Sequence, residues 1–219
     1  MKNYFINEDD YSLEQVVSRI KKTDLTPGIE PIKQDIEKNA VTLERMGVKN
    51  LAGLRKALRN KKKLHEFSQK TGIDENYLLL LRREIEGWVI KPIKIRDFCW
   101  LNEQLINTLN EIGLCSTDEI YNRLSTEEEK LEIARNHQLS RKELDYLLTL
   151  STITRIRWVS PVVARILIEA GYSSIEKIKE ADPGRLCKEI GLLNTPRNYY
   201  KGKIGERDIR RLINEACYV

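Results

Sequence analysis

One pattern of apolar residues around a glycine occurs three times in the chain, and this repetition limits the fold more than any other feature of the sequence. Six positions recur 58 residues apart: Trp100 and Trp158, Leu101 and Val159, Leu109 and Leu167, Gly113 and Gly171, Ser116 and Ser174, Ile120 and Ile178. A further copy, made of Leu43, Gly47, Asn50 and Leu54, lies 66 residues before the middle one. The chain is therefore predicted to consist of tandem copies of one small unit.

The glycine at the centre of each copy predicts a tight turn between two helices. Gly47, Gly113 and Gly171 each follow an apolar helical pattern and precede an Asn or Ser that can cap the next helix. A residue just beyond a helix end commonly needs a positive φ, which glycine adopts without steric cost. The residue after each glycine is then expected to fold back onto the preceding helix.

Helical periodicity recurs along the whole sequence and strand alternation is absent. Each copy also ends in a further helix that begins after an apolar residue and a favoured cap, namely Ile73-Asp74, Leu139-Ser140 and Ile204-Gly205. We predict an all-α fold of tandem repeats of short helices. Residues 1–90 are expected to form an N-terminal lobe with the first unit, and residues 91–219 a C-terminal lobe with units at 91–150 and 151–219.

Composition excludes several classes of protein. The chain is 41% hydrophobic and 32% charged, and no apolar run approaches the roughly 20 residues that a membrane helix needs. Its first residues lack the pattern of a secretory signal, so we expect a cytoplasmic protein without membrane contact. The four cysteines are far apart and form no CxxC pair. We expect them to be buried and reduced, and we predict no metal site and no cofactor.

The net charge of +5 is concentrated in the last third of the chain. Residues 151–219 hold 13 basic and 8 acidic side chains, whereas residues 1–150 hold 25 of each. A local basic excess suits an anionic partner, although an excess of this size also occurs on ordinary solvated surfaces.

The segment TRIRWVSPVVARILIEAGYSSIEKIKEADPGRLCKEI, residues 154–190, resembles a helix-hairpin-helix segment. This resemblance implies that the all-α fold consists of tandem helix-hairpin-helix-like (SAM-like) repeats of short helices. Together with LERMGVKNLAGLRKAL, LLRREIEGW and YKGKIGERDIRRLINEACYV, it makes nearly the whole chain similar to a bacterial helix-hairpin-helix-like family described as a domain of unknown function. The wider helix-hairpin-helix class implies sequence-independent nucleic-acid binding. In that class, hairpin amides and the next helix N-terminus contact phosphate oxygens.

The hairpin of this chain departs from that class, in which it usually reads glycine, apolar residue, glycine. The corresponding tripeptides are Trp158-Val159-Ser160 and Trp100-Leu101-Asn102, and an indole adds bulk where glycine would let the backbone approach a phosphate. Ser160 followed by Pro161 still favours a helix start that could hold an anion. Three arginines are expected near that start: Arg155, Arg157 and Arg165. The alternative interpretation makes both tryptophans core anchors and the arginines solvated.

Two other basic segments are candidates for phosphate contacts. The run from Arg55 to Lys63, with Lys61, Lys62 and Lys63, is expected at a helix C-terminus, where capping and solubility would also explain it. The segment 194–211 mixes basic and aromatic side chains: Arg197, Tyr199, Tyr200, Lys201, Lys203, Arg207, Arg210 and Arg211. Such a mixture suits a nucleic-acid surface. A turn-rich connector from Gly191 to Gly205, with tyrosines packed on the third unit, is the alternative.

No catalytic constellation is recognisable, because the chain has no GxxxxGK[ST] loop, no GxSxG elbow and no HExxH motif. The consecutive Glu127, Glu128 and Glu129 are expected to form the charged first turn of a helix. The leading prediction is non-catalytic, sequence-independent binding of nucleic acid, with DNA as the first choice, through backbone phosphates. A protein-interaction scaffold is the alternative, and the oligomeric state stays open.

Overall fold

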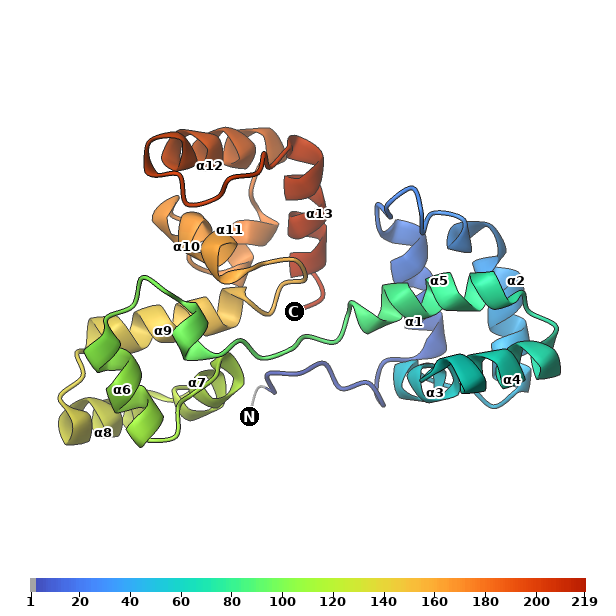
Figure 1. Cartoon of the computed structure of the whole chain (residues 1–219), viewed down its shortest axis with the longest axis horizontal. Helices are drawn as coiled ribbons and strands as arrows, with labels where there is room; N and C mark the ends of the chain where they lie inside the picture. The colour runs from blue at the N-terminus through green and yellow to red at the C-terminus, as the bar shows by residue number, and fades with distance from the viewer. Residues whose placement is uncertain (1–2) are drawn as a thin grey trace. The chain divides into compact units, whose positions relative to one another are not determined.

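The structure, a computed structural model, describes residues 3–219, and every regular element in this range is a helix (Figure 1). The elements are α1 (Leu13–Lys22), α2 (Ile32–Arg45), α3 (Leu51–Ala57), α4 (Lys61–Thr71), α5 (Glu75–Glu86), the 3-10 helix η1 (Ile95–Asp97), α6 (Glu103–Glu111), α7 (Thr117–Arg123), α8 (Glu127–His137), α9 (Arg141–Ile153), α10 (Pro161–Glu169), α11 (Ile175–Lys179), α12 (Pro183–Arg197) and α13 (Glu206–Ala216). The predicted all-α class is confirmed. None of these helices is both long enough and apolar enough to span a membrane.

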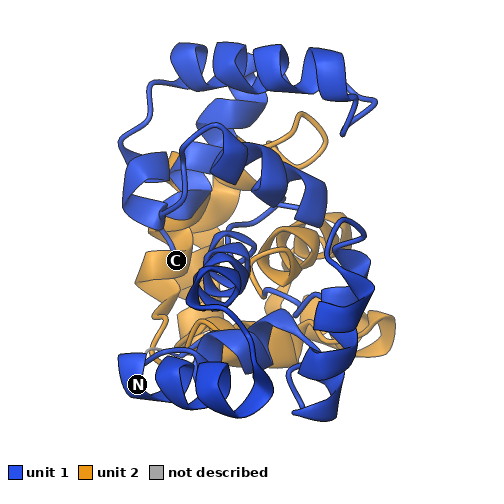
Figure 2. Cartoon of the chain, turned by 90° about the vertical axis from the view of Figure 1, so that its left-hand side faces the viewer, with its two compact units in different colours: residues 1–4, 90–219 blue, residues 5–89 orange. Residues whose placement is uncertain are grey.

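The described chain forms two compact units, each with its own apolar core (Figure 2). The N-terminal unit, residues 5–89, contains α1 to α5 and buries Leu43, Leu54 and Trp88. The C-terminal unit consists of residues 90–219 together with Asn3 and Tyr4, and it contains η1 and α6 to α13. Because each core is built from residues of one unit, the geometry of each candidate site is set within that unit.

The three predicted glycine turns are confirmed in their local geometry. Gly47, Gly113 and Gly171 have φ values of +82°, +76° and +92°. In each turn the amide of the next residue donates a hydrogen bond to the carbonyl five residues earlier, at 3.0, 2.8 and 2.9 Å. This pattern satisfies a carbonyl at the helix end and requires the left-handed backbone that only glycine adopts freely. Each turn therefore ends one helix and leads the chain into the next.

Side chains cap most of the predicted helix starts. Asn50 and Ser174 accept hydrogen bonds from the amides three residues further on, at 2.8 and 3.2 Å. Asp74 accepts the equivalent bond at the start of α5, also at 2.8 Å. Ser116 differs, because its hydroxyl donates to Asp118 and makes no cap bond to α7. These cap bonds fix the residues at which α3, α5 and α11 begin.

The expected connector from Gly191 to Gly205 is wrong in its first half. Helix α12 continues through Gly191 as far as Arg197, with Pro196 in its last turn. A proline there removes a single helical hydrogen bond close to the helix end, where its cost is smallest. The helix then stops at Asn198, whose φ is +48°. The connector is thus short, running only from Asn198 to Gly205.

Tyr4 lies fully buried in the core of the C-terminal unit, far along the chain from the residues it contacts. Its hydroxyl and that of Thr117 form a 2.8 Å hydrogen bond, and its ring meets the ring of Tyr121 edge to face at 5.6 Å between centroids. The Arg155 Nε donates to the Tyr4 carbonyl at 3.0 Å. Burial raises the pKa of the Tyr4 phenol above its ordinary value. Tyr4 therefore completes a core made otherwise from residues beyond 89.

Candidate nucleic-acid interface

Trp158 is exposed, so its interpretation as a core anchor is wrong. Its side chain is 49% exposed and its φ is +68°. A positive φ is rare for a bulky residue and easy for glycine. The guanidinium carbon of Arg157 lies 4.4 Å from the centroid of the indole ring. The chain thus adopts a left-handed backbone at Trp158 and places the indole on the surface there.

Replacing Trp158 by Gly is expected to lower the free energy of unfolding by less than about 1.5 kcal/mol. Glycine relieves a left-handed conformation that costs an L-residue roughly 1–2 kcal/mol, and this gain offsets most of the loss of a half-exposed ring with a cation–π contact worth about 0.5–1 kcal/mol. Urea denaturation measures the change. Trp158→Ala is the control, since it loses the ring but keeps the strain and should be the less stable variant. A loss above about 3 kcal/mol for the glycine variant, as for truncation of a buried aromatic, would contradict this account.

Trp100 has a different environment from Trp158, although the two occupy equivalent sequence positions. Trp100 is partly buried against the core of the C-terminal unit, and its ring meets that of Phe98 edge to face at 5.5 Å. Its Nε1 donates to the Tyr146 hydroxyl at 3.0 Å. Burial raises the pKa of Tyr146 above its ordinary value, against the effect of this bond. The anchor interpretation therefore holds in part for Trp100 only.

All three arginines expected near the hairpin, Arg155, Arg157 and Arg165, are bound within the protein. Arg155 donates from Nη1 to the Tyr121 hydroxyl at 2.9 Å, in addition to its bond to the Tyr4 carbonyl. Arg157 lies 3.9 Å from a Glu215 carboxylate oxygen, and the two side chains are only 11% and 1% exposed. The alternative interpretation expected solvated arginines. It is wrong for Arg155 and Arg157, because both guanidinium groups contact other parts of the protein.

Arg165 and Arg197 come together around one carboxylate. The Arg165 Nε donates to Glu169 at 2.8 Å and its Nη2 donates to the Tyr199 hydroxyl at 2.9 Å, with the Tyr199 ring centroid 4.1 Å from the guanidinium carbon. Arg197 forms an ion pair with the same Glu169. The structure therefore unites two predicted residues from distant parts of the sequence, but Glu169 offsets part of their charge.

Ser160 lies where the sequence predicted it. It caps α10, its Oγ accepts a hydrogen bond from the Val163 amide at 3.3 Å, and Pro161 is the first helical residue. Ser160 is exposed. The start of α10 thus faces solvent next to the surface indole of Trp158.

The segment after α12 presents an aromatic ring and two lysines on a fixed backbone. The Asn194 side chain donates to the Tyr200 carbonyl at 2.7 Å and accepts from the Tyr200 amide at 2.9 Å. The Tyr200 ring lies against Gly202 so closely that a Cβ at Gly202 would come within 2.5 Å of it. Tyr200 is 38% exposed, Lys201 and Lys203 are exposed, and neither lysine has an ion-pair partner among residues 3–219.

Arg207 and Arg211 follow on α13, one helical turn apart and hence on the same face. Arg207 is exposed and Arg211 is half-buried. Arg210, between them in sequence, pairs with Glu206 at 2.7 Å. Lys201, Lys203 and Arg207 are thus exposed residues of the C-terminal unit that the sequence predicted, as are Ser160 and Arg197.

Lys61, Lys62 and Lys63 begin a helix instead of ending one, so their predicted position is wrong. Asn60 accepts a hydrogen bond from the Lys63 amide at 2.9 Å and starts α4 there. All three lysines are exposed, and the helix dipole disfavours cations at this end. Capping thus does not explain them, and they add a separate basic surface to the N-terminal unit.

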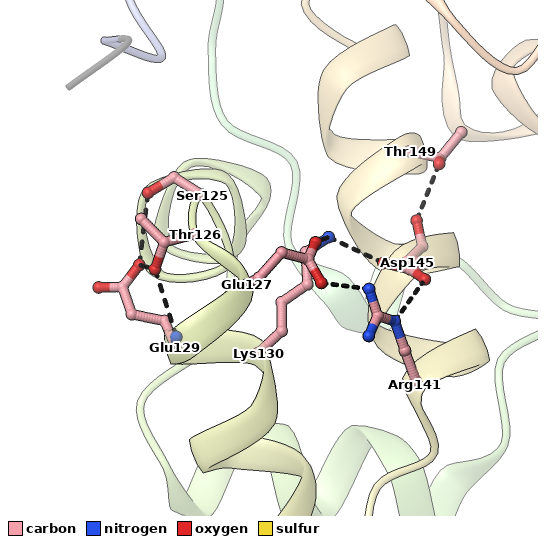
Figure 3. A network of polar contacts seen from close by, with 8 residues as sticks. All are labelled: Ser125, Thr126, Glu127, Glu129, Lys130, Arg141, Asp145 and Thr149. Atoms are coloured by element: carbon pink, nitrogen blue, oxygen red, sulfur yellow. Dashed lines mark hydrogen bonds and ion pairs between the residues drawn. The ribbon is translucent and has the colours of Figure 1, made fainter.

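The acidic run forms the first turn of α8 after the cap Thr126, as predicted, and its first member, Glu127, belongs to a network of ion pairs (Figure 3). The Lys130 Nζ lies 2.9 Å from Glu127 and 2.8 Å from Asp145, and Arg141 pairs with both carboxylates. Burial lowers the pKa of Lys130, but the bonds to Asp145 and Glu127 outweigh it and raise that pKa. The network therefore joins α8 to α9.

The cysteines do not match the sequence-based expectation of burial. Cys99, Cys115 and Cys217 are exposed and Cys187 is half-buried. The first three lie at chain reversals or helix ends, where a small residue has no core to enter. Within residues 3–219 no cluster of three or more His, Cys, Asp or Glu side chains could hold a metal ion.

Comparison with known proteins identifies one family. The model of the family described as Domain of unknown function (DUF4332) matches residues 99–218, which lie in the C-terminal unit. No curated protein and no solved structure matches the chain. The matched range contains the hairpin, the Arg165 and Arg197 cluster and the fixed segment after α12. Because it covers more than half of the chain, the protein belongs to the DUF4332 family of domains of unknown function.

Proposed function

We propose that this protein binds nucleic acid without catalysis, in a sequence-independent way, through the phosphate backbone. The observation that carries the proposal is the fixed segment after α12, where Tyr200, Lys201 and Lys203 stand exposed on a backbone held by Asn194. Exposed ammonium groups can contact phosphates, and an exposed tyrosine ring can stack on a base or ribose. Preorganisation of the segment lowers the entropic cost of making these contacts.

The local geometry of the helical turns supports an assignment of the units as helix-hairpin-helix-like. Three left-handed glycine turns share one hydrogen-bond pattern, and Trp158 has the backbone conformation of the hairpin glycine. The capped, solvent-facing start of α10 at Ser160 offers amides for a phosphate oxygen. The bound states of Arg155 and Arg157 argue against a role for them in this contact. The proposed surface is therefore narrower than the sequence predicted and centres on Lys201, Lys203 and Arg207.

The proposal is tested by fluorescence anisotropy with labelled single-stranded and double-stranded DNA and RNA over a range of salt concentrations. The full chain is compared with Lys201→Ala/Lys203→Ala. The matched control is Lys94→Ala/Lys142→Ala, which removes the same charge from exposed sites elsewhere in the C-terminal unit. We expect the first variant to bind more weakly and its salt slope to fall by about 1 for each lysine. Binding that is insensitive to salt, equal loss in both variants, or no binding to any probe contradicts the proposal.

A further inference from the structure

We propose that a groove in the N-terminal unit binds an acidic peptide segment of a partner protein and accepts one large apolar side chain of that segment. The groove has a volume of about 450 Å³ and lies beside the glycine turn between α2 and α3, against one face of α4. Its apolar lining includes Met46, Val48 and Phe67. Met46 is 44% exposed and Phe67 is half-buried, so the groove presents apolar surface to solvent.

The rim of the groove is basic. Lys56, Lys63 and Lys70 line it, together with a single acid, Glu66. Lys63, Phe67 and Lys70 share one face of α4, because positions four and seven residues apart lie on the same side of a helix. All three lysines are exposed, and within the described residues 3–219 none of them has an ion-pair partner. The groove therefore combines an open apolar lining with an uncompensated positive rim.

The corresponding groove at the third glycine turn has lining side chains that bond to one another. That groove has a volume of about 470 Å³ and is lined by Tyr172, Arg185 and Glu189. The Tyr172 hydroxyl donates to Glu189 at 2.7 Å, and the Arg185 Nε donates to the same carboxylate at 2.8 Å. In the first groove Val48 takes the place of Tyr172 after the glycine, and no such internal bridge is present among the described residues. The charged side chains Arg185 and Glu189 are therefore paired at the third turn, whereas the lysines at the first turn have no ion-pair partner among the described residues.

After the second glycine turn, a basic side chain on the next helix is also paired with acids. Arg123, at the end of α7, pairs with Glu129 at 3.4 Å and Glu132 at 3.5 Å. The helix that follows α7 begins with acids, whereas the helix that follows α3 begins with Lys61, Lys62 and Lys63. Of the three turns, all within the described residues, the first is the one with unpaired lysines around an apolar lining.

The lining favours an acidic peptide over a nucleic acid as the occupant. A phosphate backbone would meet the lysines but leave the side chains of Met46 and Phe67 in water. A peptide with acidic residues on either side of a Leu, Phe or Met can fill the apolar lining and pair with the rim at once, as amphipathic helices do in grooves. Methionine adapts its shape to such a side chain. The inference concerns the N-terminal unit and does not depend on the function proposed for the C-terminal unit.

The test uses the full chain and the fluorescent peptide EELDELFEELLDE, with a charge-reversed peptide, KKLKKLFKKLLKK, as the negative probe. The variant Lys56→Ala/Lys63→Ala/Lys70→Ala removes the rim, and Met46→Asp introduces a charge into the lining. The matched control is Lys177→Ala/Lys179→Ala/Lys188→Ala, which removes the same charge from the third unit. Hydrogen exchange on residues 43–71 reports where the peptide binds.

We expect the acidic peptide to bind the native chain and to protect residues 43–71 from exchange. Three exposed ion pairs lost together should weaken binding by about tenfold, Met46→Asp should weaken it as well, and the control triple should stay within about twofold of the native chain. Lys201→Ala/Lys203→Ala should leave peptide binding unchanged, which separates this site from the nucleic-acid surface. Failure of the acidic peptide to bind, equal weakening by the control triple, or protection elsewhere overturns the proposal. Displacement of the peptide from residues 43–71 by an oligonucleotide that binds more tightly there would also overturn it, in favour of a nucleic-acid site.

Discussion

Replacement of Tyr4 by Ala is expected to destabilise the C-terminal unit by about 3–5 kcal/mol, the usual cost of deleting a large buried aromatic ring. Tyr4 is fully buried, and its ring, hydroxyl and carbonyl contact Tyr121, Thr117 and Arg155. The truncation opens a cavity in the core and removes the partner of a buried hydroxyl. All three contacts are long-range, because their partners lie more than a hundred positions after Tyr4 in the sequence.

Hydrogen exchange followed by mass spectrometry measures this effect for each unit separately. Protection should fall across residues 93–216 and stay unchanged across residues 13–86, since Tyr4 belongs to the C-terminal unit. Tyr4→Phe is the control. It keeps the ring and loses the hydroxyl that bonds to Thr117, at a cost of about 1–2 kcal/mol, and Thr117 keeps its bond from the Ile93 amide at 3.0 Å. A loss of less than about 1 kcal/mol in Tyr4→Ala, well below the usual cost of such truncations, would show that residues 3–4 do not contribute to this core.

Features that depend on neighbours in sequence could be predicted from the chain alone. Gly47, Gly113 and Gly171 impose positive φ at helix ends for a reason that lies in the glycine itself. Ser160 before Pro161 marks the start of α10 in the same way. These local rules also explain why the all-α class and the acidic first turn of α8 could be derived.

Features that depend on a distant partner could not be predicted. Arg157 was recognisable as basic, but nothing near it indicates that it packs beside Glu215, 58 positions later. The contact between Arg165 and Tyr199 likewise depends on the length of α12, because Tyr199 lies two residues beyond the end of this helix at Arg197. Basic residues identified from sequence are thus candidates for solvent exposure or for internal pairing, and tertiary packing decides which.

The lysines of the N-terminal unit show a signal that sequence reasoning missed. The dense run at Lys61, Lys62 and Lys63 follows Asn60, whose side chain caps α4 and makes this run the start of the helix. The spacing of Lys56, Lys63 and Lys70 is seven residues in both steps, a period that places the last two on one helical face. That spacing, with Phe67 between the lysines of α4, pointed to the groove more directly than charge density did.

Glu215→Ala is expected to destabilise the C-terminal unit by about 3–5 kcal/mol, the typical cost of removing one partner of a buried ion pair. Glu215 is almost fully buried on α13, and its carboxylate lies 3.9 Å from the guanidinium of Arg157 in the hairpin before α10. The alanine leaves a nearly buried positive charge without this carboxylate. Urea denaturation of the full chain, with hydrogen exchange to assign the loss to the C-terminal unit, measures the effect.

The double variant Arg157→Met/Glu215→Leu separates the cost of removing the Glu215 carboxylate alone from the contribution of the pair to stability. Apolar side chains of similar size often replace a buried ion pair at little or no cost, so the double variant should recover most of the stability lost in Glu215→Ala. If it is as unstable as the single variant, the pair itself stabilises the hairpin.

The same double variant also tests the role of Arg157 in binding. A guanidinium committed to packing makes no phosphate contact, so the double variant should keep the nucleic-acid affinity and salt slope of the native chain, whereas loss of both would return Arg157 to the binding surface.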